Sequence, residues 1–307
     1  MGLVELEGLE VSTPSVVLVD GVALQLEPHR VVALVGESGS GKTVCALALC
    51  GLLPAGLTAR WTRLDVGGTR VSDSSELAPL RGRSIAYMPQ DASGALDPVM
   101  RVGTLIDEVL EHVAGLSNAV ERAARRHAVL VEVGFSEPSQ VERLFPHQLS
   151  GGMRQRALLA ATLAANPTVL LVDEPTTALD ASLRANVLVL LKELALRRGL
   201  ALLFITHDLA AAEAIADEVI VLYAGRVAEH GALPKVFGAP QHPYTAGLMA
   251  ARLDRGSAKP MAGAIPPVGD RPAGCRFRPR CARASPSCAE QPRLIAEVAC
   301  HHPLEPS

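Results

Sequence analysis

The sequence predicts an α/β fold built around a parallel sheet, and three observations support this. First, residues 31–35, 168–175 and 199–208 form short runs that are almost continuously apolar. Such runs are typical of strands that are buried on both faces of a parallel sheet. Second, residues 182–199 and 208–219 have helical patterns and follow two of these runs. Third, a glycine-rich loop and an acidic pair come directly after strands, at the edge where doubly wound sheets bind ligands.

Two other segments differ from this core. Residues from about 90 to 165 have mostly helical patterns, at 104–113, 118–134 and 153–164, and predict an inserted helical subdomain. From about residue 239 the chain is rich in Pro, Gly and Arg and shows little periodicity. We therefore predict one domain at residues 1–238, which contains the helical subdomain, and an irregular C-terminal extension at residues 239–307.

Composition narrows the class of protein. The 307 residues allow one large domain or two modest ones, and 49% apolar residues suffice for a buried core. Only 3% of residues are aromatic, so that core is expected to consist mainly of Leu, Val and Ala. The net charge of -3 and the pI of about 6.3 provide no overall attraction to nucleic acid. With no leader-like pattern and no run of roughly 18 apolar residues, we expect a soluble chain in the cytosol.

Residues 36–43, GESGSGKT, match the pattern G-x-x-x-x-G-K-[ST] in full and lie between a predicted strand and a predicted helix. We call them the phosphate loop. Glycines let successive N–H groups converge on phosphate oxygens, and the N-terminus of the following helix adds partial positive charge. Lys42 is expected to reach the β- and γ-phosphates of ATP, and Thr43 to hold Mg²⁺. The predicted ATP-binding residues of the loop are Gly36, Glu37, Ser38, Gly39, Ser40, Gly41, Lys42 and Thr43.

The second part of the predicted site follows two other strands. Asp173 ends the apolar run at 168–175 and is placed to bind Mg²⁺ through its water shell. Glu174 is expected to orient and deprotonate the attacking water, because a buried carboxylate pair is costly without a function or a metal. His207 follows the third strand and is expected to contact the γ-phosphate. The predicted catalytic residues are therefore Lys42, Glu174 and His207.

These motifs together identify a family resemblance. The stretch LSGGMRQRA at 149–157 resembles the signature sequence of ABC-type ATPases, and it precedes the strand that carries Asp173. Gln90 resembles the Q-loop glutamine, Asp180 lies in a D-loop-like TALD, and His207 resembles the switch histidine. The resemblance implies a P-loop ABC-type nucleotide-binding domain, with a RecA-like sheet and a helical subdomain. It also implies that Gln90 contacts ATP and Mg²⁺.

The resemblance implies in addition that the ATP site is shared between two subunits. ABC-type domains pair head to tail, and the signature of one closes over the ATP that the other holds. Ser150, Gly151 and Gly152 open a predicted helix, whose free N–H groups suit an anion. The residues implied to face the partner's ATP are Gln148, Ser150, Gly151, Gly152 and Met153.

Further stretches narrow the resemblance to a subfamily. VGESGSGKT, FPHQLSGGMRQR, HPYT at 242–245 and CRFRPRC in the tail resemble the ATP-binding subunits of oligopeptide/dipeptide ABC importers. This implies an ATPase that powers peptide import from the cytoplasmic face of the membrane. The implied partners are a homologous ATPase subunit, favoured as a heterodimer, two transmembrane permease subunits and an extracytoplasmic solute-binding protein, with no nucleic acid.

Three alternatives compete with this interpretation. The same ATPase role is compatible with other cargo, such as nickel or a metallophore. A soluble ABC ATPase of translation or DNA repair usually carries two ATPase domains or a long coiled coil, and this sequence shows neither. A catalytically impaired regulatory partner is disfavoured by the intact motifs. The sequence also departs from the family where an adenine-stacking aromatic is expected, because Ser12 and Thr13 stand there, and Asp97 replaces a common asparagine.

Four of the six cysteines lie in the tail, at Cys275, Cys281, Cys288 and Cys300. Their spacing matches neither a paired C-x2-C zinc site nor the bacterial ferredoxin pattern. Spacing alone leaves disulfides, free thiols, Zn²⁺ and an iron–sulfur cluster open. The resemblance implies a [4Fe–4S] cluster, with Zn²⁺ as the alternative. The nearby Arg276, Arg278, Arg280 and Arg283 either offset the charge of such a cluster or form a solvated basic loop. Cys45 and Cys50 are expected in the core.

Overall fold

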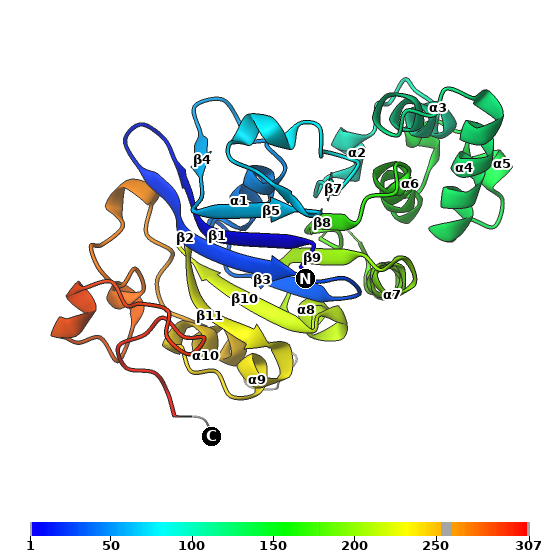
Figure 1. Cartoon of the computed structure of the whole chain (residues 1–307). Coiled ribbons are helices and arrows are strands. Elements are labelled where there is room, and N and C mark those ends of the chain that lie inside the picture. The colour runs from blue at the N-terminus through cyan, green and yellow to red at the C-terminus, as the bar shows by residue number, and fades with distance from the viewer. Residues whose placement is uncertain (1, 178, 253–259, 306–307) are drawn as a thin grey trace.

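The computed structural model describes residues 2–177, 179–252 and 260–305. At its centre lies a six-stranded sheet with the order β11-β10-β3-β9-β8-β7 (Figure 1). All neighbouring pairs are parallel except β10 and β11. The strands are β3 (Val31–Val35), β7 (Ile85–Met88), β8 (Val169–Asp173), β9 (Ala201–Thr206), β10 (Glu218–Tyr223) and β11 (Arg226–Ala232).

The predicted fold class is confirmed. The apolar runs at 31–35, 168–175 and 199–208 form β3, β8 and β9, and every residue of these three strands is buried. Helices cover both faces of the sheet, which explains why these strands lack alternation. The ends of β3, β7, β8 and β9 lead into the phosphate loop, Gln90, Glu174 and His207, respectively. The parallel arrangement therefore gathers the predicted site at one edge.

A second, antiparallel sheet was not predicted. Its strand order is β2-β1-β5-β6, and β4 also pairs with β1. In β2, Val22, Leu24 and Leu26 are buried while the residues between them are exposed. This alternation is the sequence feature that predicts a half-buried strand. The strands are β1 (Val4–Ser12), β2 (Val17–Leu26), β4 (Thr58–Arg60), β5 (Arg63–Val66) and β6 (Thr69–Arg70).

Helix α1 (Lys42–Leu49) packs into the core that the two sheets share. Its buried residues belong to one apolar cluster that also contains Leu6 of β1 and Leu34 of β3. Cys45 and Cys50 belong to this cluster and are fully buried, as predicted. Burial raises the pKa of both thiols to about 12, so both remain neutral.

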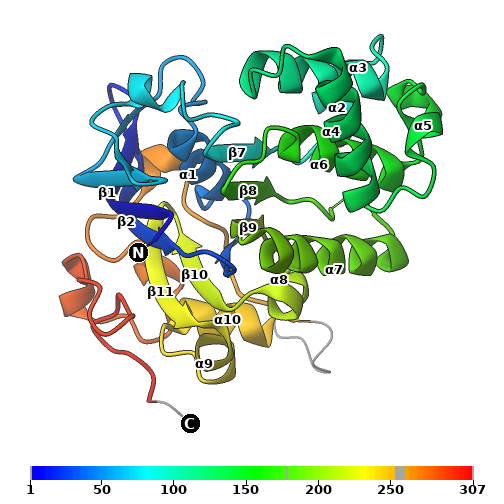
Figure 2. The ribbon, with the colours of Figure 1, turned by 45° about the vertical axis from the view of Figure 1, so that its right-hand side comes forward.

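A group of helices projects from one side of the central sheet (Figure 2). Its residues share an apolar cluster with β7, β8 and β9, and α7 packs against the same cluster. None of the helices in the described part of the chain is long and apolar enough to cross a membrane. The helices of this group are α2 (Ala92–Ala95), α3 (Val102–Glu108), a π-helical turn (Val109–Val113), α4 (Ala119–Glu132), α5 (Pro138–Val141) and α6 (Gly151–Leu163), and the neighbouring α7 spans Ala181–Arg198.

The C-terminal extension is more ordered than predicted. After α8 (Leu209–Ile215) and α9 (Leu233–Gly238), residues Pro243–Ala250 form α10. The HPYT stretch starts this helix, because His242 caps its N-terminus and Pro243 occupies the first helical position. The prediction of irregular structure throughout the tail is therefore wrong at α10. Beyond it, short 3-10 turns lie at Val268–Asp270, Arg278–Arg280 and Pro286–Ala289.

An aromatic cluster fixes the extension to the core. Phe277 packs edge-on against Tyr223 of β10, with ring centroids 5.2 Å apart, and its centroid is 5.5 Å from that of Tyr244 in α10. His242 completes the cluster, and burial lowers its pKa to about 4, so its ring is neutral near pH 7. Aromatic pairs of this geometry contribute beyond the area they bury. The extension thus shares a hydrophobic core with the ATPase sheet.

Replacing the aromatic anchor of the tail should destabilise the whole chain. Phe277 is 4% exposed, so Phe277→Ala removes a buried ring and should lower the free energy of unfolding by about 3 kcal/mol. The measurement is the shift of the urea-unfolding midpoint of the full chain. Leu294→Ala serves as the control, because Leu294 is 43% exposed and its truncation should change stability little. Equal shifts for the two variants would contradict a shared core.

Candidate functional site

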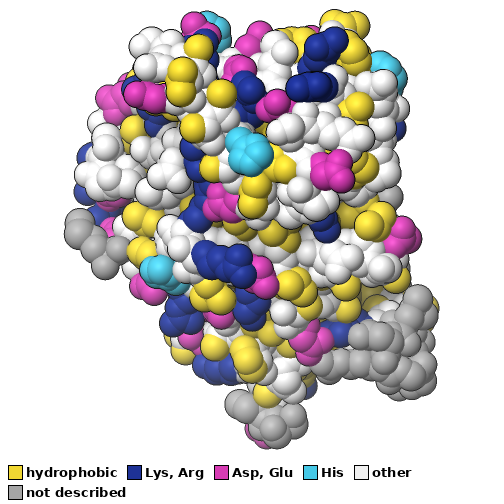
Figure 3. Space-filling view, turned by 90° about the vertical axis from the view of Figure 1, so that its right-hand side faces the viewer, with side chains coloured by type: hydrophobic (Ala, Val, Ile, Leu, Met, Phe, Trp, Pro, Cys, Tyr) yellow, Lys and Arg dark blue, Asp and Glu magenta, His cyan; other side chains and the backbone are white. Residues whose placement is uncertain are grey.

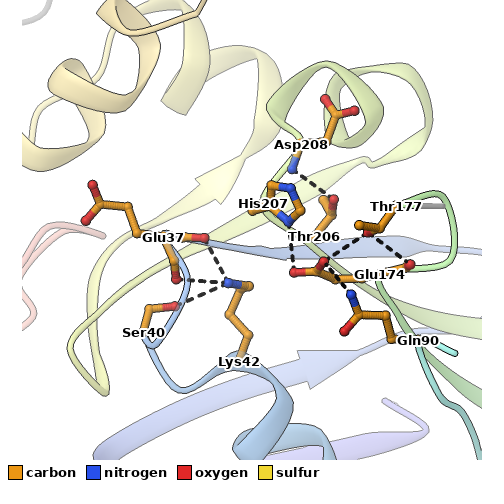
Figure 4. A network of polar contacts seen from close by, with 10 residues as sticks. Glu37, Ser40, Lys42, Gln90, Glu174, Thr177, Thr206, His207 and Asp208 are labelled. Atoms are coloured by element: carbon orange, nitrogen blue, oxygen red, sulfur yellow. Dashed lines mark hydrogen bonds and ion pairs between the residues drawn. The ribbon is translucent and has the colours of Figure 1, made fainter. Parts of the chain in front are cut away.

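The phosphate loop closes around the ammonium group of Lys42. Lys42 Nζ donates to the carbonyl oxygens of Gly36 at 2.8 Å and Glu37 at 3.0 Å, and to Ser40 Oγ at 3.5 Å (Figure 4). Burial lowers the pKa of Lys42, while the carboxylates of Glu174 and Asp173 oppose that shift. A buried charge is costly unless it is paired and hydrogen-bonded. The loop therefore adopts the conformation that solvates this one group.

Glycine is required at specific points of the loop. Gly36 and Gly41 have φ values of 155° and 104°, which side chains of L-residues rarely adopt. A Cβ atom at Gly36 would also overlap the carbonyl oxygen of Leu222 in β10. The loop can therefore pass directly over the neighbouring strand and turn into α1 only with glycine at these positions.

Asp173 lies at the buried end of β8 beside the phosphate loop. Tyr87 Oη donates to its Oδ2 at 3.0 Å, and its Oδ1 is buried without any hydrogen-bond partner in the described structure. Burial raises the pKa of Asp173, and hydrogen bonds from Thr43 and Tyr87 oppose the rise. Buried acceptors are nearly always satisfied, so an orphaned carboxylate oxygen next to Thr43 suits a hard cation such as Mg²⁺.

Glu174 is the meeting point of three strand ends (Figure 4). His207 Nδ1 lies 2.9 Å from Glu174 Oε1. Glu174 Oε2 accepts two hydrogen bonds, from Gln90 Nε2 at 3.3 Å and from Thr177 Oγ1 at 3.0 Å. Burial raises the pKa of Glu174, but hydrogen bonds from His207 and Thr177 outweigh it, and the net shift is downward. Glu174 also has φ 43°, a strained value for a residue with a side chain. The carboxylate is thus held ionised in a fixed position.

Lys42, Gln90 and Glu174 line one cavity of about 390 Å³. It is lined by residues from the phosphate loop and α1, by Gln90 and Glu174, and by parts of the chain that sequence analysis did not assign to the site. The complete lining is Leu18, Ser38, Gly39, Gly41, Lys42, Thr43, Val44, Gln90, Glu174, Val268 and Arg271. The predicted residues Lys42, Thr43, Gln90 and Glu174 therefore come together, whereas the predicted Asp173 and His207 do not line this cavity. The lining residues that were missed are Leu18, Val44, Val268 and Arg271.

Comparison with known proteins identifies the family. The ABC transporter family matches residues 19–177, which contain the phosphate loop, the helical group and the acidic pair. The chain belongs to the ABC transporter family. A second match, to the C-terminal region of oligopeptide/dipeptide transporters, covers residues 228–288 and so includes β11, α9, α10 and most of the described tail.

Similar proteins cover almost the whole chain. The oligopeptide transport ATP-binding protein AppD of Bacillus subtilis is 38% identical, and the match covers 90% of this chain and 87% of that protein. The dipeptide transport ATP-binding protein DppD of Escherichia coli is 38% identical, with coverages of 94% and 91%. Among solved structures, the dimeric ATP-binding cassette MJ0796 with ADP and Pi superimposes with a TM-score of 0.65 at 26% identity, over 75% of this chain and 98% of that one.

The ABC signature lies apart from the chain's own phosphate site. Ser150 caps α6 and accepts from the backbone N–H of Met153 at 3.3 Å, and both Ser150 and Gly151 are exposed. Gly152 packs against Leu183, where a Cβ atom would lie 3.1 Å from a methyl group. None of the signature residues lines the cavity around Lys42. Their exposed helix N-terminus faces outward, as an ABC domain that shares its ATP site would require.

Two other predicted residues act locally as caps. Gln148 Oε1 accepts from the backbone N–H of Phe145 at 2.8 Å, and Asp180 caps α7 by accepting from Leu183 at 2.9 Å. Both positions are therefore fixed by the fold itself. Residue 178, within the predicted D-loop, lies outside the described residues.

The C-terminal extension holds the phosphate loop through Glu37. Tyr244 Oη accepts a hydrogen bond from the Glu37 backbone N–H at 3.0 Å. Arg280 binds the Glu37 carboxylate with both terminal nitrogens, at 2.6 and 2.9 Å. The hydrogen bond to Glu37 raises the pKa of Arg280, and its guanidinium also lies over the Tyr223 and Phe277 rings. Residues of HPYT and CRFRPRC thus act on the ATP site, which their sequence patterns did not predict.

The two alternatives proposed for the tail arginines are both wrong for Arg276 and Arg280. Arg276 pairs with Asp20 at 3.0 Å and donates to the Ala224 carbonyl, and its side chain is nearly buried. Arg280 is equally enclosed against Glu37. Neither side chain is solvated, and each pairs with a carboxylate of the ATPase core, although Arg276 shares Asp20 with Arg226. They serve as ties between the extension and that core.

The predicted metal site in the tail is not confirmed. Within the described ranges no group of three or more His, Cys, Asp or Glu side chains is placed to hold a metal ion. The predicted ligands Cys275, Cys281, Cys288 and Cys300 are free thiols. Burial raises the pKa of Cys275 and Cys300. The backbone N–H of Cys275 donates to the Cys288 carbonyl oxygen at 3.1 Å, so these two positions are adjacent, but the four side chains do not form a closed ligand set.

The link between the tail and the phosphate loop can be measured by a double-mutant cycle. Arg280→Ala and Glu37→Gln should each lower the free energy of unfolding, and the double variant should lose less than their sum. We expect a coupling of about 1–2 kcal/mol, reduced from a fully buried pair because Glu37 is partly exposed. Urea unfolding of the four proteins gives the value.

The exposed pair Lys235–Glu297 provides the control cycle, since both of its side chains are more than a third exposed. Surface pairs contribute little, so its coupling should be well below that of Arg280 with Glu37. Additive effects of Arg280→Ala and Glu37→Gln would show that the extension does not hold the loop.

Proposed function

We propose that this chain is the ATP-hydrolysing subunit of a peptide importer. The observation that carries the proposal is the meeting of Glu174, His207 and Gln90 beside Lys42, in a chain whose tail packs on the same site. Relatives named for oligopeptide and dipeptide transport match over about nine-tenths of the chain. The match to the C-terminal region of oligopeptide/dipeptide transporters supports peptides as the cargo class.

In this proposal the phosphate loop binds ATP. Lys42 gives up its contacts with the loop carbonyls for the β- and γ-phosphates, whose charge offsets the burial that lowers its pKa. Thr43, Gln90 and Asp173 hold Mg²⁺, and the unpartnered Oδ1 of Asp173 supports this assignment. When bound, Mg²⁺ neutralises charge on the β- and γ-phosphate oxygens.

Glu174 and His207 perform the chemical step of the proposal. The ionised Glu174 orients a water and accepts its proton as the water oxygen bonds to the γ-phosphorus. The bond from the γ-phosphorus to the bridging oxygen breaks, and ADP and inorganic phosphate leave. His207 is hydrogen-bonded to Glu174 and half-exposed, so it can turn toward the γ-phosphate when ATP enters. Gln90 directly precedes the helical group, so a shift of Gln90 on nucleotide binding would move the start of that group.

A homologous ATPase subunit completes each site in this proposal. Ser150, Gly151 and Gly152 offer free N–H groups at the start of α6, with Gln148 and Met153 flanking them. They would bind the γ-phosphate of ATP held by the partner. Asp180, at the N-terminus of α7, would lie at the same interface. ATP then joins the two subunits, and hydrolysis releases them. Identical or paralogous partners are compatible with this geometry, and the peptide-importer class favours a heterodimer.

The helical group is the proposed contact with two transmembrane permease subunits. It follows Gln90 directly, so movement at the ATP site reaches it first. Val99 at its edge is 78% exposed, and Figure 3 shows hydrophobic side chains scattered among charged ones on this side of the molecule. The chain would therefore bind at the cytoplasmic face of the membrane, and an extracytoplasmic solute-binding protein would deliver the peptide to the permease.

We also propose that the tail thiols hold a [4Fe–4S] cluster, with Zn²⁺ as the alternative. Four thiolates suit either group. The neighbouring positions of Cys275, Cys288 and Cys300 support the proposal, as does the 3.3 Å hydrogen bond from the His302 N–H to Cys300 Sγ. Because the described residues form no closed ligand set, binding requires the tail turns to move together. The role proposed for the group is to order the extension.

Replacing the proposed general base tests the ATPase. In the assembled transporter, Glu174→Gln should bind ATP as the wild type does and hydrolyse it at least about 100-fold more slowly, because the amide cannot accept the proton. Peptide-stimulated phosphate release in proteoliposomes measures this. Glu27→Gln, at an exposed carboxylate between β2 and β3 and outside the helical group, should leave the rate unchanged. Normal turnover of Glu174→Gln would exclude Glu174 as the base. If no peptide stimulates phosphate release by the wild type, peptides are excluded as the cargo.

Metal analysis tests the tail proposal. The chain purified without oxygen should contain about four irons and matching sulfide. Cys288→Ser should lose them and become easier to proteolyse beyond residue 260. Cys45→Ala should retain them, because Cys45 lies in the core. Zinc in place of iron would select the alternative, and the absence of both would refute the metal proposal while leaving the ATPase proposal intact.

A further inference from the structure

A short segment of the extension forms part of the cavity wall beside the phosphate loop. Val268 and Arg271 line the same cavity as Lys42 and Thr43, although they are more than 200 residues away in sequence. The turn that carries them spans Val268–Asp270 and follows Pro267. Figure 1 shows the corresponding orange segment beside the end of the β1–β2 hairpin. The cavity is thus enclosed by the ATPase core and the extension together.

Arg271 is held firmly in this wall. Its Nη1 donates to the carbonyl oxygens of Val17 at 3.1 Å and Leu18 at 2.7 Å in β2. Gly225 lies against the same contact with φ 86°, and a Cβ atom there would overlap the Leu18 carbonyl. The Nε of Arg271 is buried and has no partner in the described structure. Arg271 is therefore tied to β2 through Nη1, while its Nε–H is not hydrogen-bonded in the described structure.

The cavity combines two kinds of lining. Lys42 and Thr43 suit phosphates and Mg²⁺. The side chains of Leu18, Val44 and Val268 are apolar, and Arg271 adds a planar cation beside them. A guanidinium group binds anions, and it also stacks on aromatic rings, for which the neighbouring apolar side chains are suited. The lining is therefore compatible with a nucleotide whose base lies against Arg271.

Ser12 and Thr13, which occupy the position expected for an adenine-stacking aromatic, do not contribute to the cavity. Thr13 is engaged in a local turn, where its Oγ1 accepts from the Val16 N–H at 3.1 Å. The base of a bound nucleotide therefore needs another partner, and Arg271 is the planar side chain that lines the cavity.

We infer that Arg271, flanked by Leu18 and Val268, holds the purine base of the bound nucleotide by stacking its guanidinium on the ring. This rests on the proposed binding of ATP at residues 36–43 and assigns the base-binding part of that site to the C-terminal extension. Because Arg276 and Arg280 tie the same extension to Asp20 and Glu37, its position sets the base wall and the phosphate loop at once.

The test compares a ligand that has a base with one that lacks it. Binding of Mg·ATP and of Mg·tripolyphosphate to the purified full chain is measured by calorimetry for wild type and variants. Arg271→Ala should weaken the binding of Mg·ATP about tenfold and change the affinity for Mg·tripolyphosphate by less than about twofold. Stacking on one base contributes on that scale. Arg271→Lys can still donate to the Val17 and Leu18 carbonyls but lacks the plane, so it should weaken ATP by a similar factor.

The controls separate this inference from the proposed function. Lys42→Ala should weaken both ligands, and Arg293→Ala, at an exposed arginine of the same tail, should change neither. Equal losses of ATP and tripolyphosphate in Arg271→Ala would overturn base stacking, as would full ATP affinity in Arg271→Lys. If wild type binds neither ligand, or Lys42→Ala changes neither, the proposed ATP site itself fails.

Discussion

The need to solvate one buried ammonium group organises this structure. Lys42 is enclosed at the start of α1, and oxygens of its own loop, together with the nearby Asp173 and Glu174, compensate its charge. That arrangement requires glycine at Gly36 and Gly41 and a loop that crosses directly over β10. It also leaves the ammonium ready to exchange loop carbonyls for phosphate oxygens. The acidic pair and the loop are thus two parts of one charge-balanced site that is incomplete without an anion and a cation.

The C-terminal extension is a structural part of this site. Glu37 lies within the phosphate loop, yet its backbone N–H and its carboxylate are bound by Tyr244 and Arg280 of the extension. Arg280 directly precedes Cys281, so any group that gathers the tail thiols also acts on the residue that grips Glu37. The aromatic cluster around Phe277 makes this connection rigid. A change in the tail can therefore reach the nucleotide through two contacts, without a long pathway.

The sequence predicted the parts of the molecule that depend on local pattern. Strands β3, β8 and β9 were predictable because burial on both faces leaves continuous apolar runs, and the phosphate loop because its glycines follow a fixed spacing. The role of the extension was not predictable, since Arg280–Glu37 and Arg271–Leu18 join residues more than 240 positions apart and no sequence pattern links the two partners of either pair. The tail cysteines show the same limit: their spacing does not fix how four thiols lie in space.

The central claim is that this chain holds Mg·ATP at Lys42 while the signature of a second ATPase subunit completes the site. An electron cryomicroscopy structure of the assembled transporter, carrying the hydrolysis-deficient chain and Mg·ATP, tests it most directly. The account predicts nucleotide between the phosphate loop and the partner's signature motif, and the signature at Ser150 of this chain placed on the nucleotide that the partner holds. Nucleotide contacted by one subunit alone, with Ser150 facing solvent or the permease, would contradict it.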